Sequence, residues 1–212
     1  MNLANELLFR AIFTALWLIV IANLAHVRYA TREPADKLID HKGRHDRRTH
    51  IVVMAFLASF LFGGIILYAI LPSWIAFLSI PLPAWFRFIM GCVAALTIPF
   101  TLWGYWTLGK NWVHALEPSK FIERKEENLV TGGPYRYVRN PIYLGDFTFG
   151  IAAALLASNW LILLPEAFIV ILVYGQIDGE ERMLMERFGD EYREYVKRTP
   201  RFIPKFKREN PT

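Results

Sequence analysis

Residues 128–143, Asn-Leu-Val-Thr-Gly-Gly-Pro-Tyr-Arg-Tyr-Val-Arg-Asn-Pro-Ile-Tyr, combine backbone and side-chain features that suit the binding of an anion. The Gly-Gly-Pro sequence at 132–134 predicts a tight turn, where the backbone can come close to a ligand. Pro141 restricts the residue before it and precedes an apolar run, so we expect a helix to begin here. The N–H groups at such a helix start, with Arg136 and Arg139, could receive a carboxylate or phosphate. In the alternative interpretation, the arginines and tyrosines only anchor the chain at a membrane interface.

A second polar segment begins with Glu180 and Glu181, directly after another apolar run. Anionic lipid headgroups would repel these carboxylates unless a cation or hydroxyl groups engaged them, and a sulfonium, an ammonium or a ribose would be suitable. Apolar and aromatic residues then recur at helical spacing and predict an amphipathic helix: Met183, Leu184, Phe188, Tyr192 and Tyr195. Alternatively, the two glutamates only favour the N-terminus of a solvated helix.

The elements that must position these segments are membrane spans. Hydrophobic residues make up 54% of the chain, and the charged 20% are gathered in blocks. A span needs about 20 apolar helical residues, and we place five, at 7–25, 51–71, 86–108, 143–157 and 160–177. The last two form a hairpin around Ser158 and Asn159, with a bend expected at Pro165. The expected fold is an all-α integral membrane protein with a cytoplasmic loop and a C-terminal amphipathic helix, divided into regions 1–108 and 109–212.

The distribution of lysine and arginine predicts the orientation of these spans. Basic residues gather in segments 28–48, 110–139 and 182–208, whereas 72–85 and 158–159 contain none. Short basic loops remain cytoplasmic. With five spans, the N-terminus is expected outside and both polar segments and the C-terminus in the cytoplasm. The first run is expected to stay in the mature protein, because charges interrupt its start and its apolar stretch is longer than that of a signal peptide.

Charge and metal-ligand residues indicate which partners to expect. The net charge of +5 lies next to predicted spans, where anionic lipids explain it, so we expect membrane lipids and no nucleic acid as partners. Two interpretations remain for His41, His45 and His50: a metal site if this loop were helical, or a basic loop against headgroups, which we favour. Cys92, the single cysteine, is interpreted as a small core residue.

In combination, these motifs resemble the isoprenylcysteine carboxyl methyltransferases and their bacterial and archaeal relatives, which are related to membrane phospholipid methyltransferases. The resemblance covers roughly residues 109–204. It depends on Leu129-Val130, Gly133-Pro134-Tyr135, Arg139-Asn140-Pro141-Ile142-Tyr143, the short hairpin, Glu180-Glu181, Phe188-Gly189-Asp190-Glu191-Tyr192 and Pro200-Arg201-Phe202-Ile203-Pro204.

The resemblance implies a cytoplasmic pocket for S-adenosyl-L-methionine and a second entrance from the membrane for a small lipophilic acceptor. The implied cofactor-binding residues are Asn128, Leu129, Val130, Tyr135, Asn140, Pro141, Ile142, Tyr143 and Glu180. Arg139 and Tyr143 are expected at the catalytic centre, and Gln176 at the substrate. Methyl transfer from a sulfonium mainly requires orientation and a dry pocket, so we expect no metal and no covalent intermediate.

Two positions depart from the family's pattern. Asn140 stands where the family usually has histidine, and asparagine can neither carry charge nor act as a general base. Gln176 aligns with an arginine that engages substrate in the prenylcysteine enzymes, and a neutral amide holds a carboxylate less well. We therefore expect another amphiphilic acceptor, methylated on nitrogen, sulfur or an oxygen without a neighbouring negative charge.

Two other classes share part of this pattern. Membrane sterol and steroid reductases, which use NADPH, have an element similar to Tyr143-Leu144-Gly145-Asp146. However, they usually have more spans, and Glu180-Glu181 would repel the 2′-phosphate of NADPH. A non-catalytic membrane protein that retains the fold is the third hypothesis.

Overall fold

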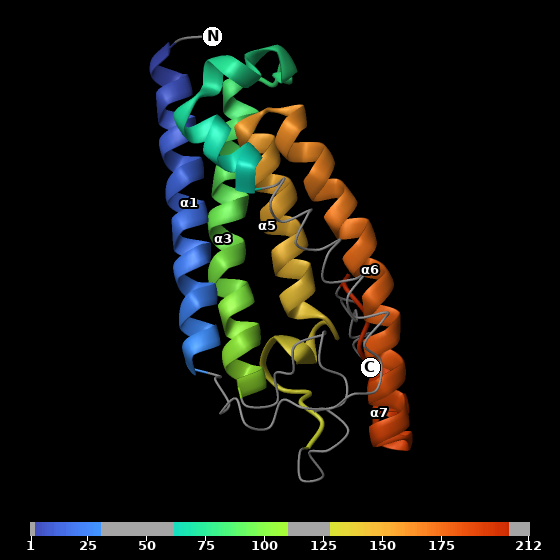
Figure 1. Cartoon of the computed structure of the whole chain (residues 1–212). Helices are drawn as coiled ribbons and strands as arrows, with labels where there is room; N and C mark the ends of the chain where they lie inside the picture. Colours follow the sequence, from blue (N-terminus) through green and yellow to red (C-terminus); the bar gives the residue numbers. More distant parts are fainter. Residues whose placement is uncertain (1–2, 31–61, 110–127, 204–212) are drawn as a thin grey trace, which may run out of the picture. The chain divides into compact units, whose positions relative to one another are not determined.

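The computed structural model describes residues 3–30, 62–109 and 128–203, and these are mostly helical (Figure 1). In chain order they form α1 (Leu3–Ala30), a helical stretch at 62–70, the 3₁₀ helix η2 (Pro72–Leu78), α3 (Ala84–Leu108), the 3₁₀ helix η4 (Gly133–Arg136), α5 (Pro141–Ala157), α6 (Trp160–Phe188) and α7 (Asp190–Arg198). Among these residues, the only β-type pairing is an isolated bridge between Ser79 and Asn159. The all-α prediction is confirmed for the described part of the chain.

Three helical segments are long and apolar enough to cross a membrane: Leu3–Asn23, Ala84–Leu108 and Trp160–Phe188. Pro141–Ala157 is a shorter apolar helix. These segments identify an integral membrane protein. Most of the predicted span 51–71 lies outside the described residues, so the count of five spans stays a prediction.

The predicted C-terminal amphipathic helix is present as α7, which buries Tyr192 and Tyr195, but the prediction that one helix continues from Met183 to Tyr195 is wrong. α6 continues through both glutamates to Phe188, and α7 is a separate helix that begins at Asp190. Residues 180–188 are mostly strong helix formers, which carry α6 beyond its apolar part. Gly189 then takes φ +54, a conformation that glycine adopts without strain, and separates the two helices.

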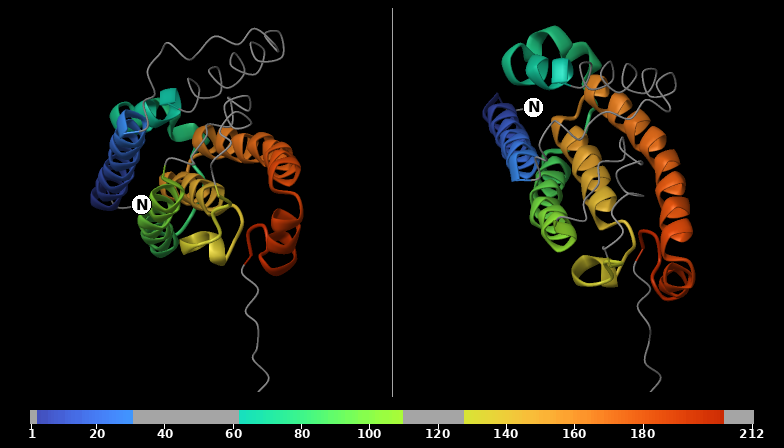
Figure 2. Two further views of the ribbon diagram at one scale, coloured as in Figure 1. Left: turned by 90° about the horizontal axis from the view of Figure 1, so that it is seen from below. Right: turned by 60° about the horizontal axis from the view of Figure 1, so that its bottom comes forward.

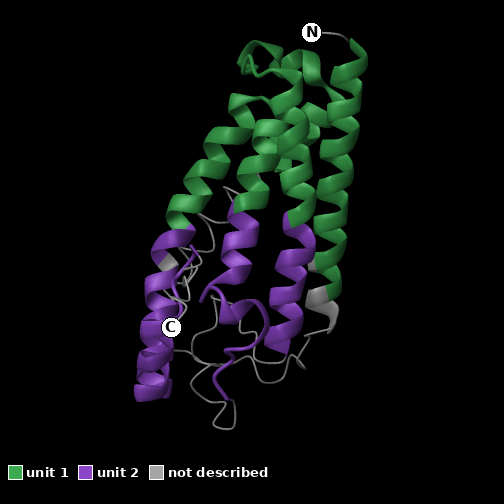
Figure 3. Cartoon of the chain, turned by 180° about the vertical axis from the view of Figure 1, so that it is seen from behind, with its two compact units in different colours: residues 1–96, 148–172 green, residues 97–147, 173–212 purple. Residues whose placement is uncertain are grey.

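The chain divides into two compact units, which Figure 3 colours separately. Unit 1 comprises residues 1–96 and 148–172, and unit 2 comprises residues 97–147 and 173–212. Helices α3, α5 and α6 each contribute one part to each unit. The boundary expected at 108/109 rests on sequence motifs and stays a prediction.

Unit 1 has a core of apolar and aromatic side chains from several helices. Phe13 of α1 is fully buried and contacts Tyr68, with ring centroids 5.0 Å apart. At the predicted turn between α5 and α6, Ser158 has φ +58. The side chain of Asn159 accepts from the N–H of Leu161 at 2.9 Å and donates to the carbonyl of Ile75 at 2.9 Å. These bonds satisfy backbone groups at the turn, and the predicted short hairpin is confirmed.

In unit 2, α3 and α5 approach each other closely, and they run side by side in both views of Figure 2. A Cβ atom added at Gly104 would lie 2.9 Å from Cγ1 of Ile142. One added at Gly145 would lie 1.9 Å from Oγ1 of Thr101. Small residues therefore permit this contact, as is common between membrane helices.

Candidate functional site

The loop at 128–140 belongs to unit 2 and contains the predicted turn. Gly133 has φ +55 and begins η4. A Cβ atom at this position would lie 2.5 Å from Oγ1 of Thr107, so both the backbone conformation and the close contact require glycine. The N–H of Tyr135 donates to the carbonyl of Gly132 at 3.1 Å and closes the turn.

The closing segment of the described chain is bonded to the end of this loop. The N–H of Arg139 donates to the carbonyl of Pro200 at 2.8 Å, and the N–H of Asn140 donates to the carbonyl of Arg201 at 3.2 Å. The carbonyl of Asn140 accepts from the N–H of Leu144 at 3.0 Å, in the first turn of α5. The loop is thus held from both sides where α5 begins.

The carboxylate of Glu181 on α6 is the centre of an ionic cluster. Arg139 donates to its two oxygens at 3.2 and 3.1 Å, and Arg201 donates to the same oxygens at 3.2 and 2.7 Å. The amide of Asn140 adds a bond of 3.0 Å. The side chains of Arg139 and Glu181 are 10% and 13% exposed, so their paired charges are largely removed from solvent. One carboxylate therefore connects α6, the loop and the closing segment.

Further bonds fix the two arginines of this cluster. Arg139 also donates to the carbonyl of Thr199 at 2.7 Å. Arg201 forms a second ion pair, with Asp178, at 2.8 Å. Hydrogen bonds to Glu181 raise the pKa of the Arg201 guanidinium, which stays charged at any physiological pH.

Glu180 has a different environment from its neighbour. The hydroxyl of Tyr143 on α5 donates to Oε1 of Glu180 at 2.5 Å. Successive residues of a helix point about 100° apart, which follows from 3.6 residues per turn. For this reason Glu181 serves the ionic cluster while Glu180 meets a neutral hydroxyl group.

A cavity of about 80 Å³ lies in unit 2, beside the loop. Its lining is apolar and aromatic apart from two polar side chains, and consists of Leu108, Asn128, Leu129, Val130, Tyr135, Arg139, Leu184, Phe188, Tyr192 and Tyr195. The hydroxyl of Tyr195 donates to the carbonyl of Tyr135 at 2.6 Å and so connects α7 to the loop. Burial raises the pKa of Tyr192 to about 12, so this phenol is neutral at physiological pH.

The structure brings several of the predicted site residues together. Five of them line the cavity: Asn128, Leu129, Val130, Tyr135 and Arg139. Tyr143 and Glu180 form their own pair. Pro141 is buried as the first residue of α5, and Ile142 lies against Gly104. Gln176 is on α6, but its side chain lies outside the described part of the structure. The cofactor, catalytic and substrate roles of all these residues stay predictions.

The sequence motifs did not identify Glu181, Arg201 and Tyr195 as residues that build this site. Each was part of a motif, but nothing in the sequence indicated that the closing Pro200-Arg201 segment would bond to the loop at 139–140. The aromatic spacing toward the C-terminus was the available signal for Tyr195. His41, His45 and His50 lie outside the described residues, so the metal alternative is not tested. In the described ranges, no group of three or more His, Cys, Asp or Glu residues could hold a metal ion.

Comparison with known proteins gives a consistent result. Residues 86–191 match the family model described as phospholipid methyltransferase, and this range is half of the chain. The chain is 37% identical over 81 residues to protein-S-isoprenylcysteine O-methyltransferase of Schizosaccharomyces pombe, an alignment that covers 38% of this chain and 34% of the relative. The Homo sapiens protein of the same name is 32% identical over 99 residues, covering 46% and 34%.

A bacterial relative carries a different name. Methanethiol S-methyltransferase 1 of Bradyrhizobium diazoefficiens is 40% identical over 70 residues, which cover 33% of this chain and 24% of the relative. These alignments span about a third or less of the relatives' own lengths. The family match includes the loop, α5 and α6, which build much of the site, but it ends before Tyr192 and Tyr195 of α7 and before the closing segment. This chain belongs to the phospholipid methyltransferase family.

Proposed function

We propose that this protein transfers a methyl group from S-adenosylmethionine to a small lipophilic or amphiphilic acceptor at the membrane. One observation carries the proposal. A cavity lined by Asn128, Leu129, Val130, Tyr135 and Arg139 lies in the loop of a phospholipid methyltransferase family member, and Glu181 holds that loop to α6 and the closing segment.

The described residues have the chemistry that the cofactor needs. Leu129, Val130 and the tyrosine rings of the cavity provide apolar and aromatic surfaces for a nucleoside. Glu180 provides a carboxylate for a cationic or hydroxyl-bearing part of the molecule. The cavity of about 80 Å³ is smaller than a complete cofactor pocket, which has roughly 300–1,000 Å³, so its lining forms only one part of the proposed site. S-adenosylmethionine supplies an activated methyl group.

The chain's own contribution is orientation and exclusion of water. An acceptor with a good nucleophilic atom needs correct alignment more than a strong base. Tyr143 and Glu180 orient each other through their hydrogen bond, which makes both suited to hold a ligand in a fixed direction. Arg139 lines the cavity while its guanidinium binds Glu181 and the Thr199 carbonyl, so we assign it a positioning role at the reaction centre. Asn140 likewise positions the loop through Glu181.

The membrane arrangement belongs to the same proposal. Five spans, an outside N-terminus and a cytoplasmic C-terminus would place the loop where S-adenosylmethionine is made. The acceptor would enter from the membrane and meet the neutral amide of Gln176. Relatives named for an isoprenylcysteine and for methanethiol support an acceptor with a nucleophilic heteroatom.

Calorimetric binding to the detergent-purified protein tests the proposal, with S-adenosylmethionine, S-adenosylhomocysteine and NADPH as separate ligands. We expect saturable binding of both adenosyl compounds and none of NADPH. Replacing Tyr135, which is 8% exposed and lines the cavity, by alanine should weaken adenosyl binding at least tenfold. Tyr137→Ala is the matched control, because Tyr137 lies in the same loop but is 55% exposed.

The binding results test the proposed function and the role of each residue separately. Binding of NADPH alone, or of none of the three ligands, would contradict the proposed function. Glu180→Gln tests one residue: unchanged affinity for S-adenosylmethionine would remove Glu180 from the cofactor site. Equal losses in the Tyr135 and Tyr137 variants would show that the effect comes from loop stability and not from the cavity.

A further inference from the structure

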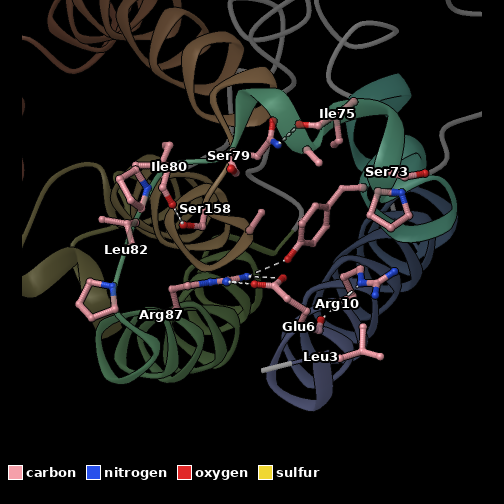
Figure 4. A pocket seen from close by; sticks show the side chains of 17 residues that line it. Leu3, Glu6, Arg10, Ser73, Ile75, Ser79, Ile80, Leu82, Arg87 and Ser158 are labelled. Carbon is pink, nitrogen blue, oxygen red and sulfur yellow. Dashed lines mark hydrogen bonds and ion pairs between the residues drawn. The ribbon is translucent and has the colours of Figure 1, made fainter. Parts of the chain in front are cut away.

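A second and much larger cavity, of about 690 Å³, lies entirely in unit 1 (Figure 4). It is formed where the start of α1, η2 and the connection after it, the start of α3 and the turn between α5 and α6 meet. None of its lining residues belongs to the site proposed above for methyl transfer. Its volume falls in the range of about 300–1,000 Å³ that is usual for small-ligand sites.

A buried ion pair lies at the wall of this cavity. The side chain of Arg87 on α3 is 1% exposed and donates to the two carboxylate oxygens of Glu6 on α1 at 2.5 and 3.3 Å. Arg87 also donates to the hydroxyl of Tyr68 at 3.1 Å and to the carbonyl of Leu156 at 2.8 Å. Figure 4 shows Glu6 and Arg87 pointing toward each other. Ionisable groups in a membrane-spanning region are expensive and usually mark a functional site.

Arg10 is the third charged residue of the lining. Within the described residues its guanidinium forms no ion pair, and its hydrogen bond to the carbonyl of Glu6 is long, at 3.4 Å. One glutamate and two arginines leave the cavity with one positive charge that Glu6 does not neutralise. The cavity therefore favours an anion, and the side chain of Arg10 offers the donors that bind a phosphate in bidentate geometry.

Exposed aromatic residues place this cavity at the level of lipid headgroups. Trp74 and Phe77 of η2 are 69% and 82% exposed, and Trp85, near the start of α3, is 66% exposed. Trp160, the first residue of α6, is 44% exposed. Tryptophan in particular gathers at membrane–water interfaces, where one part of the ring is apolar and the N–H meets water. A ligand at this depth has a headgroup in the interface and chains in the apolar region.

We propose that the cavity of unit 1 binds an anionic phospholipid. The phosphate lies against Arg10, with the hydroxyl of Ser73 as a second donor on the cavity wall, and the upper part of the acyl chains lies against Ile75, Ile80 and Leu82. The Glu6–Arg87 pair keeps its own internal partners and holds α1 to α3 beside the lipid. This site is additional to the methyl-transfer site and does not depend on it.

Native mass spectrometry of the detergent-purified full-length protein tests this site. The protein is titrated with phosphatidylglycerol and, separately, with phosphatidylcholine, and the dissociation constant of the first bound lipid is measured. We expect at least tenfold tighter binding of phosphatidylglycerol. A third titration, with inorganic phosphate as competitor, distinguishes a lipid from a free phosphate ion.

Two variants test the location of the bound lipid. Arg10→Gln removes the positive charge. Ala76→Trp places a large side chain in the cavity and reduces its volume, at a lining position that is exposed. Each should weaken phosphatidylglycerol binding at least tenfold while the melting temperature stays close to that of the wild type. Arg193→Gln is the charge-matched control, because Arg193 is an exposed residue of α7, and it should change nothing.

Several results would overturn the proposal. Equal affinity for the two lipids would remove the anion site. Full affinity for phosphatidylglycerol in either folded variant would place the lipid elsewhere. Tight binding of inorganic phosphate together with no preference between the two lipids would show that the occupant is a free phosphate ion.

Discussion

The central buried charge has the opposite sign in the two units. In unit 1 the most buried ion among the described residues is a cation, Arg87, and it forms an ion pair with the carboxylate of Glu6. In unit 2 the central ion is an anion, Glu181, and two guanidinium groups share it. A buried pair gives little net stability, but removal of one partner leaves the other charge uncompensated and is strongly destabilising.

The segments that each cluster connects also differ. Arg87 and Glu6 join α3 to α1, two long helices that also meet where the guanidinium of Arg87 lies over the ring of Phe9, 4.2 Å from its centroid. Glu181 instead joins α6 to a loop and a closing segment, which contain only one short 3₁₀ helix, η4, between them. The ionic cluster of unit 2 therefore controls the position of the candidate site, whereas the pair in unit 1 mainly supports helix packing.

The largest effect is expected from Glu6→Leu in unit 1. Arg87 would lose the carboxylate of Glu6 while remaining buried, which lowers the free energy of unfolding by about 3–5 kcal/mol. The double variant Glu6→Leu/Arg87→Leu removes both charges and should be less destabilised than the single variant. Unfolding in detergent measures both. If the double variant is as unstable as the single one, the loss of stability comes mainly from the hydrogen bonds of Arg87 to Tyr68 and Leu156 and not from its unpaired charge.

In unit 2, Glu181→Gln should have a smaller effect on stability and a larger one on ligand binding. The loss of charge-assisted hydrogen bonds lowers the free energy of unfolding by about 2 kcal/mol. The loop at 128–140 is then less well positioned, so we expect at least tenfold weaker binding of S-adenosylmethionine. Calorimetry and thermal unfolding measure the two effects.

A matched control for this change is Glu194→Gln on α7, because the pair of Glu194 with Lys197 is solvent-exposed. It should alter neither quantity. If Glu6→Leu weakened S-adenosylmethionine binding as much as Glu181→Gln does, the ionic cluster of unit 2 would not have the special role at the candidate site that we assign to it.

The sequence predicted those parts of the molecule that depend on local patterns. Apolar length predicted the helices, and Gly132-Gly133-Pro134 predicted a turn that the structure confirms. The Ser158-Asn159 hairpin was also readable, because only two polar residues separate two apolar runs.

The sequence could not predict which charged residues would pair. Glu6 is far from Arg87 in the chain, and Glu181 is far from Arg139, so these pairs depend on tertiary contacts that no spacing reveals. Glu180 and Glu181 were treated as one acidic motif, yet their different directions on α6 give them separate partners. The C-terminal end of α6 could not be predicted either, because the end of an apolar run need not be the end of a helix.

The smallest effect is expected at the contact between α7 and the loop. Tyr195→Phe removes the hydroxyl that donates to the carbonyl of Tyr135 at 2.6 Å but keeps the ring, which is 3% exposed. A neutral hydrogen bond of this kind contributes about 1 kcal/mol to stability, so the free energy of unfolding should fall by about 1 kcal/mol and S-adenosylmethionine should bind at most roughly fivefold more weakly. Tyr137→Phe removes a hydroxyl from a tyrosine of the loop that is 55% exposed and should have no effect. If Tyr195→Phe leaves the affinity unchanged, the ionic cluster alone positions the loop and α7 only covers it; a loss as large as that of Glu181→Gln would instead make this hydrogen bond an equal support of the cavity.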